Sequence, residues 1–116
     1  MRHHKKGRTL GRTRDQKRAL MRSLMKSLIM HERISTTEAK AKELRPMIEK
    51  LVTHARHDTV AKRRLVATRL GGDSKEVKKL FTTIAPRYKK RAGGYVRIVK
   101  RAPSANGRRP AYIAFL

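Results

Sequence analysis

Two histidines and two glutamates are, by type and spacing, the best candidates in the chain for metal ligands and for an acid–base pair. His54 and His57 lie three positions apart on a predicted helix and could share a metal ion. Two ligands make a weak site, because the chain has no cysteine and no suitable carboxylate trio nearby. Glu43 and Glu49 are six positions apart and lie on different helix faces, so they do not form an acid–base pair. We therefore expect no enzymatic activity, no metal and no cofactor.

Positive charge is the dominant chemical property of the chain. Its 116 residues include 32 lysines and arginines but only 8 aspartates and glutamates, which gives a formal net charge of +24. Because this charge makes the compact state repel itself, a partner of opposite sign is expected to offset it. Nucleic acid is the leading candidate, since many distributed contacts to phosphates release counterions. An anionic membrane surface or an acidic protein is the competing partner.

The acidic residues are confined to the middle of the chain, and both ends are cationic. Residues 1–14 carry six basic and no acidic side chains, and residues 77–116 carry eleven basic and no acidic ones. Soluble surfaces usually mix both signs, so a long carboxylate-free zone indicates contact with a polyanion. We expect the nucleic-acid contacts to come from Arg2, His3, Lys5, Lys6, Arg8, Arg12, Arg14, Arg18, Arg22, Lys62, Arg63, Arg64, Arg87, Lys89, Lys90, Arg91, Tyr95, Arg97, Lys100, Arg101, Arg108 and Arg109.

One aromatic residue of the cationic C-terminal part is a candidate for stacking on a base. Residues 90–98 weakly resemble the RNA-recognition signature, in which a basic residue precedes alternating glycine and aromatic residues. That module stacks bases on two or three aromatic rings, whereas this stretch offers only Tyr95. The sequence leaves two roles open for Tyr95, which are stacking on a base and covering the hydrophobic core.

The first two elements that must position these cations are predicted helices. Thr13 and Gln16 have the spacing of a capping box, which predicts a helix that starts there and carries an apolar stripe up to residue 29. Ser35 and Glu38 have the same spacing and predict a second helix, which runs to about residue 57. This second helix is expected to kink near residues 42–46, where a proline interrupts the pattern, and to bury Ala39, Leu44, Ile48, Leu51, Val52 and Ala55.

Two shorter helices follow. Asp58 or Thr59 is expected to cap the third helix, which ends at the glycine pair at 71–72. Asp73 is expected to start the fourth helix, whose apolar residues recur at helical spacing. Pro86 is expected to stop it.

The pattern after residue 86 changes to that of strands. Residues 95–100 and 111–116 are rich in β-branched and aromatic side chains, and the segment between them is rich in turn residues. These two stretches are therefore expected to pair as an antiparallel hairpin. Because an isolated hairpin is marginal in water, it needs a packed helix or a third strand, for which residues 33–36 are the candidate.

Four stretches in this order resemble one known family. MRHHKKGRTLGR at the start, HERISTTEAKAKELRPMIEKLVTHAR in the centre, KRRLVATRL, and IAPRYKKRAGGYVRIVKR together are similar to bacterial large-subunit ribosomal protein seventeen. The last stretch is the most specific. The resemblance extends over essentially the whole chain.

The resemblance implies a structural protein of the large ribosomal subunit in the cytoplasm. It implies an α+β fold, with about four helices on a small, roughly three-stranded mixed or antiparallel sheet. Residues 1–14 match a basic arm that lies along RNA, and residues 15–116 match a single domain, with a helical centre at 15–85 and a basic hairpin at 94–116. The implied partners are large-subunit ribosomal RNA and neighbouring large-subunit proteins, near the polypeptide exit tunnel, with no membrane and no small-molecule substrate.

The chain departs from the family pattern at its C-terminal end. The family commonly has a Gly-Asp pair in the hairpin loop and a glutamate in the last strand, where this sequence has Gly107 followed by Arg108 and Arg109, and Ala114. The hairpin is therefore more cationic than is usual for the family.

Two other functions are compatible with the same charge. A nucleoid-type basic DNA-binding protein would use the same helices, and competition between structured RNA and duplex DNA separates the two hypotheses. A cationic protein of membrane surfaces is disfavoured, because the predicted helices and hairpin offer a core for the apolar face of the first helix.

Overall fold

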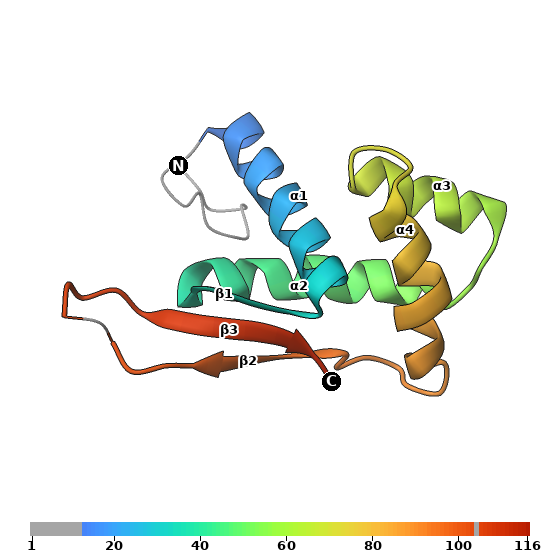
Figure 1. Cartoon of the computed structure of the whole chain (residues 1–116). Helices are drawn as coiled ribbons and strands as arrows, with labels where there is room; N and C mark the ends of the chain where they lie inside the picture. Colours follow the sequence, from blue (N-terminus) through green and yellow to red (C-terminus); the bar gives the residue numbers. More distant parts are fainter. Residues whose placement is uncertain (1–12, 104) are drawn as a thin grey trace, which may run out of the picture.

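The computed structural model describes residues 13–103 and 105–116 of the chain. The four α-helices and the three-stranded antiparallel sheet in these residues confirm the predicted α+β fold (Figure 1). The elements follow in the order α1 (Arg14–His31), β1 (Arg33–Thr37), α2 (Glu38–Ala55), α3 (Val60–Arg69), α4 (Lys75–Lys79), the π-helix η1 (Leu80–Ile84), the 3₁₀ helix η2 (Ala85–Tyr88), β2 (Val96–Lys100) and β3 (Pro110–Phe115).

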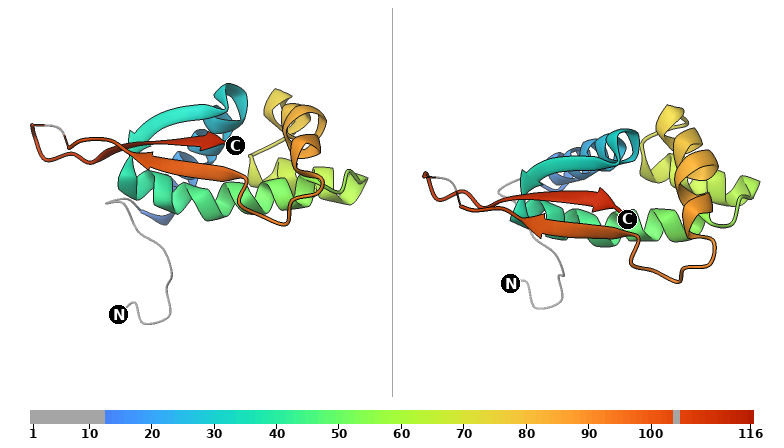
Figure 2. Two further views of the ribbon diagram at one scale, coloured as in Figure 1. Left: turned by 90° about the horizontal axis from the view of Figure 1, so that it is seen from below. Right: turned by 60° about the horizontal axis from the view of Figure 1, so that its bottom comes forward.

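The sheet has the strand order β1–β3–β2, with β3 antiparallel to both neighbours. Ile113 of β3 lies opposite Ile34 of β1 and Ile98 of β2, so one apolar row crosses all three strands. The third strand predicted at residues 33–36 is therefore confirmed, and it extends the hairpin on the β3 side. α2 packs against all three strands, and seen from below in Figure 2 the strands lie in front of α1 and α2.

α1 starts as its sequence predicts. The backbone N–H of Gln16 donates to the Thr13 hydroxyl at 3.2 Å, and the N–H of Thr13 donates to the Gln16 side-chain oxygen at 3.1 Å. These two bonds form the predicted capping box and satisfy donors that the helix leaves unpaired. The buried face of α1 consists of Met21, Met25, Leu28 and Ile29.

α2 starts at a different cap from the predicted one. Its N-cap is Thr37, whose hydroxyl accepts from the N–H of Lys40 at 3.3 Å. The prediction that Ser35 is the cap was wrong, because that residue belongs to β1 and pairs with Tyr112 of β3. The helix also buries Ala41 instead of the expected Ala39.

Pro46 lies inside α2 without breaking it. The helix runs without interruption from Glu38 to Ala55, and its buried face of Leu44, Ile48, Leu51, Val52 and Ala55 agrees with the prediction. Proline removes one backbone donor, but burial of this face against the sheet favours a continuous helix.

α3 ends in a glycine-rich turn. Its N-cap is Thr59, one of the two predicted caps. At the other end, the N–H of Gly72 donates to the carbonyl of Ala67 at 2.7 Å, and the N–H of Gly71 donates to that of Thr68 at 3.2 Å. This hydrogen-bond pair is a Schellman motif, and Gly71 occupies its left-handed position with a φ of 87°.

The helical segment after this turn is longer than predicted. Ser74, not Asp73, is the N-cap of α4, and the chain stays helical through η1 and η2 as far as Tyr88. Pro86 does not stop the segment, because it lies in the first turn of η2, a position whose backbone angles suit the fixed φ of proline.

One hydrophobic cluster joins all the layers. α2 lies at its centre and contacts the sheet, α1, α3 and η1. The largest fully buried side chain is that of Tyr95, at the entrance to β2, and its ring centroid lies 5.2 Å from that of Tyr88. Within the described residues, no charged or polar side chain is fully buried in this cluster.

Candidate nucleic-acid interface

The predicted contact residues do not form a single patch. Arg2, His3, Lys5, Lys6, Arg8 and Arg12 lie outside the described residues. The others lie on α1, on α3, in η2 and the segment after it, and on the β2–β3 hairpin. The hairpin loop and α3 lie at opposite ends of the molecule (Figure 1), so an extended polyanion could contact several sides at once.

The β2–β3 hairpin carries cations away from the helices. Figures 1 and 2 show that the connection between the two strands extends beyond β1 and α2. Gly107 has a φ of 80° in this connection, and the N–H of Arg108 donates to the Asn106 side chain at 3.4 Å. The predicted contact residues on the hairpin are all exposed, namely Arg97, Lys100, Arg101, Arg108 and Arg109.

A second cationic segment follows η2 and is held in place by Arg56, the C-cap residue of α2. Lys89, Lys90 and Arg91 are exposed in this segment. Arg56 Nη2 donates to the carbonyl oxygen of Lys89 at 2.8 Å, and Nη1 donates to the Tyr95 hydroxyl at 3.2 Å. The same hydroxyl donates to the carbonyl oxygen of Arg91 at 3.2 Å. Arg56 and Tyr95 therefore fix the backbone from which three cations project, although Arg56 was not among the predicted residues.

The base-stacking role predicted for Tyr95 is contradicted by its burial. Its side chain is 0% exposed, and it packs among the core residues next to Tyr88. No base can reach a ring in this position. The alternative role left open by the sequence, covering the core, is the one that the structure supports.

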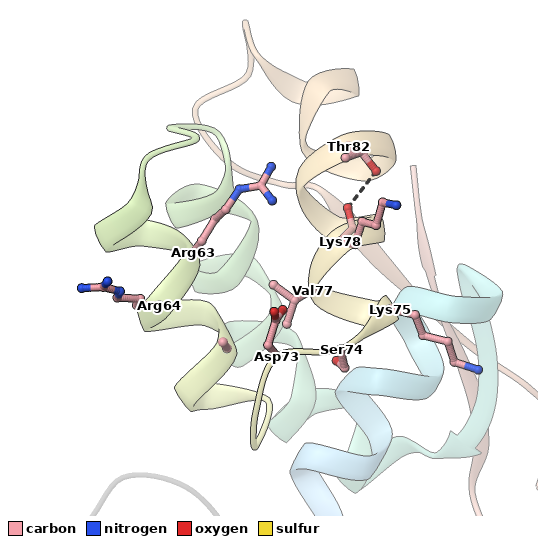
Figure 3. A pocket seen from close by; sticks show the side chains of 9 residues that line it. Arg63, Arg64, Asp73, Ser74, Lys75, Val77, Lys78 and Thr82 are labelled. Atoms are coloured by element: carbon pink, nitrogen blue, oxygen red, sulfur yellow. Dashed lines mark hydrogen bonds between the residues drawn. The ribbon is translucent and has the colours of Figure 1, made fainter.

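An open cavity of about 610 Å³ with cationic edges lies between α3 and the segment of α4 and η1. In Figure 3, Asp73 and Val77 face the space between the two helices, whereas the charged ends of Arg64 and Lys75 point away from it. The cavity therefore does not gather cations around one anion. Its edges present separate charges to solvent, including Lys75 and Lys78, which were not predicted as contacts.

Arg63 on the same helix is already paired. Its Nε and Nη2 donate to the two carboxylate oxygens of Asp58 at 2.6 and 2.9 Å. This hydrogen bonding lowers the pKa of Asp58 and raises the pKa of Arg63, so both groups stay charged at neutral pH. Arg63 is therefore less available to bind a phosphate than its exposed neighbour Arg64. The described residues contain no carboxylate partner for Arg64.

Two further predicted contacts also have carboxylate partners. Arg87 binds the carboxylate of Glu32 through both terminal nitrogens, and Lys100 lies 3.3 Å from the carboxylate of Glu38. These pairs are partly exposed, so each contributes little to stability, but each neutralises a cation locally.

Arg22 packs against the turn after α3. A Cβ on Gly71 would lie 2.7 Å from Arg22 Cδ, so glycine leaves the space that this side chain occupies. The half-buried Arg22 therefore packs within the protein, in contrast to Arg14 and Arg18, which are exposed on the same helix. Arg14 and Arg18 remain the candidate contacts on α1.

The histidine pair does not gather further ligands. No group of three or more metal-binding side chains occurs within residues 13–103 and 105–116. Lys62 Nζ lies 3.2 Å from His54 Nδ1, and burial together with nearby Lys62, Arg69 and Lys50 lowers the pKa of His54. The His54 ring is therefore neutral at physiological pH and accepts a hydrogen bond from Lys62.

The sheet carries a basic and aromatic face that the sequence analysis missed. Arg33 of β1 and Arg97 of β2 lie opposite Ala114 of β3 on either side. The guanidinium carbon of Arg33 lies 3.9 Å from the ring centroid of Tyr112, and that of Arg101 lies 5.4 Å from it. Only the strand order places these side chains together, because Arg33 is separated from the others by more than sixty residues.

Comparison with known sequences identifies the family of the chain. The profile of the family described as Ribosomal protein L17 matches residues 20–116. The chain belongs to this family. The resemblance on which the sequence analysis relied is therefore confirmed.

Two relatives in the L17 family show the extent of the similarity. The chain is 51% identical over 100 residues to "Large ribosomal subunit protein bL17" of Geobacter metallireducens, an alignment that covers 86% of this chain and 56% of the relative. It is 52% identical over 100 residues to the protein of the same name from Geobacter sulfurreducens, with 86% and 57% covered. The chain thus spans somewhat more than half the length of these two relatives.

In the described part of this L17-family chain, no helix is both long enough and apolar enough to cross a bilayer.

Proposed function

We propose that this protein is a structural, non-catalytic component of the large ribosomal subunit in the cytoplasm, where it binds and stabilises large-subunit ribosomal RNA. Membership of the L17 family supports this role, and the two relatives are named as large-subunit proteins. The proposed position near the polypeptide exit tunnel, beside other large-subunit proteins, rests on the family resemblance.

The arrangement of charge is the observation that carries the RNA-binding proposal. From residue 77 to residue 116 the chain has eleven basic side chains and no carboxylate. Eight of these eleven cations lie on the exposed segment after η2 and on the projecting hairpin, at separate sites on the surface. Separate exposed cations suit the backbone of a folded RNA, which offers phosphates in many directions and is recognised largely by shape. The basic residues at the N-terminus and on α1 extend this set of contacts.

Salt dependence of binding tests this function. If about ten phosphates are neutralised, log K against log salt for full-length protein and large-subunit ribosomal RNA should have a slope of about −7 to −9. A slope shallower than about −3 would contradict contact with many phosphates. Duplex DNA added at equal phosphate should fail to displace the RNA, and displacement would favour a nucleoid-type function instead.

Two lysines provide a matched pair of variants. Lys90 is exposed, and the described residues contain no carboxylate partner for it, whereas Lys42 is paired with Glu38 at 2.8 Å. Both substitutions to glutamine remove one positive charge. Lys90→Gln should make the slope shallower by about 0.7 to 0.9, and Lys42→Gln should change it less. Equal effects of the two would show that only net charge matters, and not the placement proposed here.

A further inference from the structure

One face of the sheet is covered by helices and the other is open. α2 packs on the face that includes Ala111 and Ile113, both of which are 0% exposed. Alternate residues of a strand point to opposite faces, so Tyr112 and Ala114 belong to the other face. In the left view of Figure 2 the strands are seen from this side, and no helix crosses in front of them.

The open face is cationic and carries one aromatic ring. Across the three strands, Arg33, Ala114 and Arg97 form one row, and Ser35, Tyr112 and Val99 form the next. Arg101 continues the β2 side, next to Tyr112. None of these residues is acidic, and the three arginines are all exposed. This open sheet face therefore combines a planar ring with three guanidinium groups.

The contacts of Tyr112 show what holds its ring in the free protein. The Arg33 and Arg101 guanidinium carbons lie 3.9 and 5.4 Å from the ring centroid. Such pairs at exposed positions are weak, and stacking of a nucleic-acid base on an aromatic side chain is stronger. A base can therefore replace the guanidinium groups on the ring, while the released arginines bind the phosphates on either side.

We propose that the open sheet face binds an unpaired RNA nucleotide, whose base stacks on Tyr112 while Arg33, Arg97 and Arg101 contact the flanking phosphates. This inference rests on the RNA-binding function proposed above and names the kind of RNA that this face takes. Duplex RNA does not supply such a base, because its bases are stacked inside the helix. A loop, a bulge or a single-stranded end does.

The charge of the face argues for RNA as the occupant and against a second copy of the chain. Two copies would bring two sets of three arginines together without a carboxylate on either face. The face also has little apolar surface. In the two rows described above, it comes only from Val99, Ala114 and the ring of Tyr112. An anionic chain that carries planar bases can pair its phosphates with the arginines and stack a base on the ring of Tyr112.

A pair of short probes separates stacking from phosphate binding. One is a single-stranded RNA of eight adenylates, and the other is an eight-unit abasic ribose phosphate chain of equal charge. With full-length protein at fixed salt, Tyr112→Ala should weaken binding of the oligoadenylate by about 5- to 100-fold and leave binding of the abasic chain unchanged. Tyr112→Phe should bind both probes within about twofold of the unsubstituted protein, because it keeps the ring.

A second measurement does not depend on removing the ring. The chain has no tryptophan, so Tyr112→Trp introduces a single tryptophan on the open sheet face, whose emission can be excited separately from that of the tyrosines. Oligoadenylate should quench its emission, and the abasic chain should not.

Quenching by neither probe, or equal losses of affinity for both probes in Tyr112→Ala, would overturn the stacking proposal while leaving RNA binding intact. If the unsubstituted protein bound neither probe but still bound large-subunit ribosomal RNA, the stacking proposal alone would fail. Failure to bind any RNA would overturn both proposals.

Discussion

The carboxylate of Glu49, on α2, accepts hydrogen bonds from the backbone N–H of Tyr95 at 3.0 and 3.1 Å through its two oxygens. The N–H of Val96 lies 3.3 Å from one of the same oxygens. A single side chain therefore anchors Tyr95 and the first residue of β2 to the central helix, beside the point where Arg56 holds Lys89. This anchoring connects the position of the cationic segment after η2 to the packing of the core.

Glu49→Ala should destabilise the fold measurably. The substitution leaves two backbone donors without their charged acceptor, and hydrogen bonds to charged groups contribute about 1.5–3 kcal/mol each. We expect a loss of about 2 kcal/mol in the free energy of unfolding, measured by urea denaturation followed by circular dichroism. Asp58→Ala removes a carboxylate from an exposed pair and should lower the midpoint much less. Equal losses in the two variants would contradict the anchoring role of Glu49.

Gly71→Ala should also destabilise the protein, for a reason that lies in the backbone. Gly71 has a φ of 87°, and a Cβ there would lie 2.7 Å from Arg22 Cδ. The left-handed conformation costs a residue with a side chain about 1–2 kcal/mol, and the displacement of Arg22 adds to that cost. Gly93→Ala is the matched control, because nothing lies within 4 Å of its Cβ position. Thermal melting should show a lower midpoint for Gly71→Ala than for Gly93→Ala, and the reverse order would refute the interpretation.

Local sequence patterns predicted most of the fold because they act over a few residues. The spacing of Thr13 and Gln16 determines one helix start, and the glycines at 71–72 determine one helix end. Where two local patterns competed, the sequence alone did not decide between them. Ser35 has the spacing of a cap, but strand pairing with Tyr112 takes that residue into β1 and moves the cap to Thr37.

The candidate interface was harder to predict because it depends on contacts between distant segments. Charge composition pointed to the cations after η2 and on the hairpin, and the structure shows that these side chains are exposed. It could not show that Arg63 is paired with Asp58, nor that Tyr95 is buried next to Arg56. The arrangement of Arg33 with Tyr112 requires the strand order β1–β3–β2, which no short stretch of sequence contains.

Ala114→Glu should weaken RNA binding by neutralising the open sheet face. Ala114 lies between Arg33 and Arg97 in the strand register, so a carboxylate there would pair with both guanidinium groups. Ala114→Gln has nearly the same shape without the charge and serves as the control. At fixed salt, the glutamate variant should bind the eight-adenylate RNA more weakly than the glutamine variant, with a shallower salt slope by about 1. Identical slopes would show that these arginines do not contact phosphates.

Acid should destabilise the protein partly through Glu32, which links the end of α1 to η2 and α4. The hydrogen bond from Arg87 is the largest cause that lowers the pKa of Glu32 below 4.5, and Lys79 lowers it further, while partial burial acts in the opposite direction. Because the pKa is lower in the folded state, the unfolded chain takes up the proton first as the pH falls. The stabilisation by Glu32 is therefore present above about pH 4.5 and is lost as the pH falls through the lower folded-state pKa.

Glu32→Gln removes this titration and isolates its contribution. Urea midpoints measured from pH 7 to pH 3 should fall less steeply for the variant than for the unsubstituted protein, since the remaining carboxylates titrate in both. At pH 7 the variant should be less stable by no more than about 1 kcal/mol, because Glu32 and Arg87 are partly exposed and screened by solvent. Arg87→Gln should reproduce most of the change in slope, and the double variant should add little to it. Parallel pH profiles for the variant and the unsubstituted protein would show that the Glu32 pairs do not contribute to acid sensitivity.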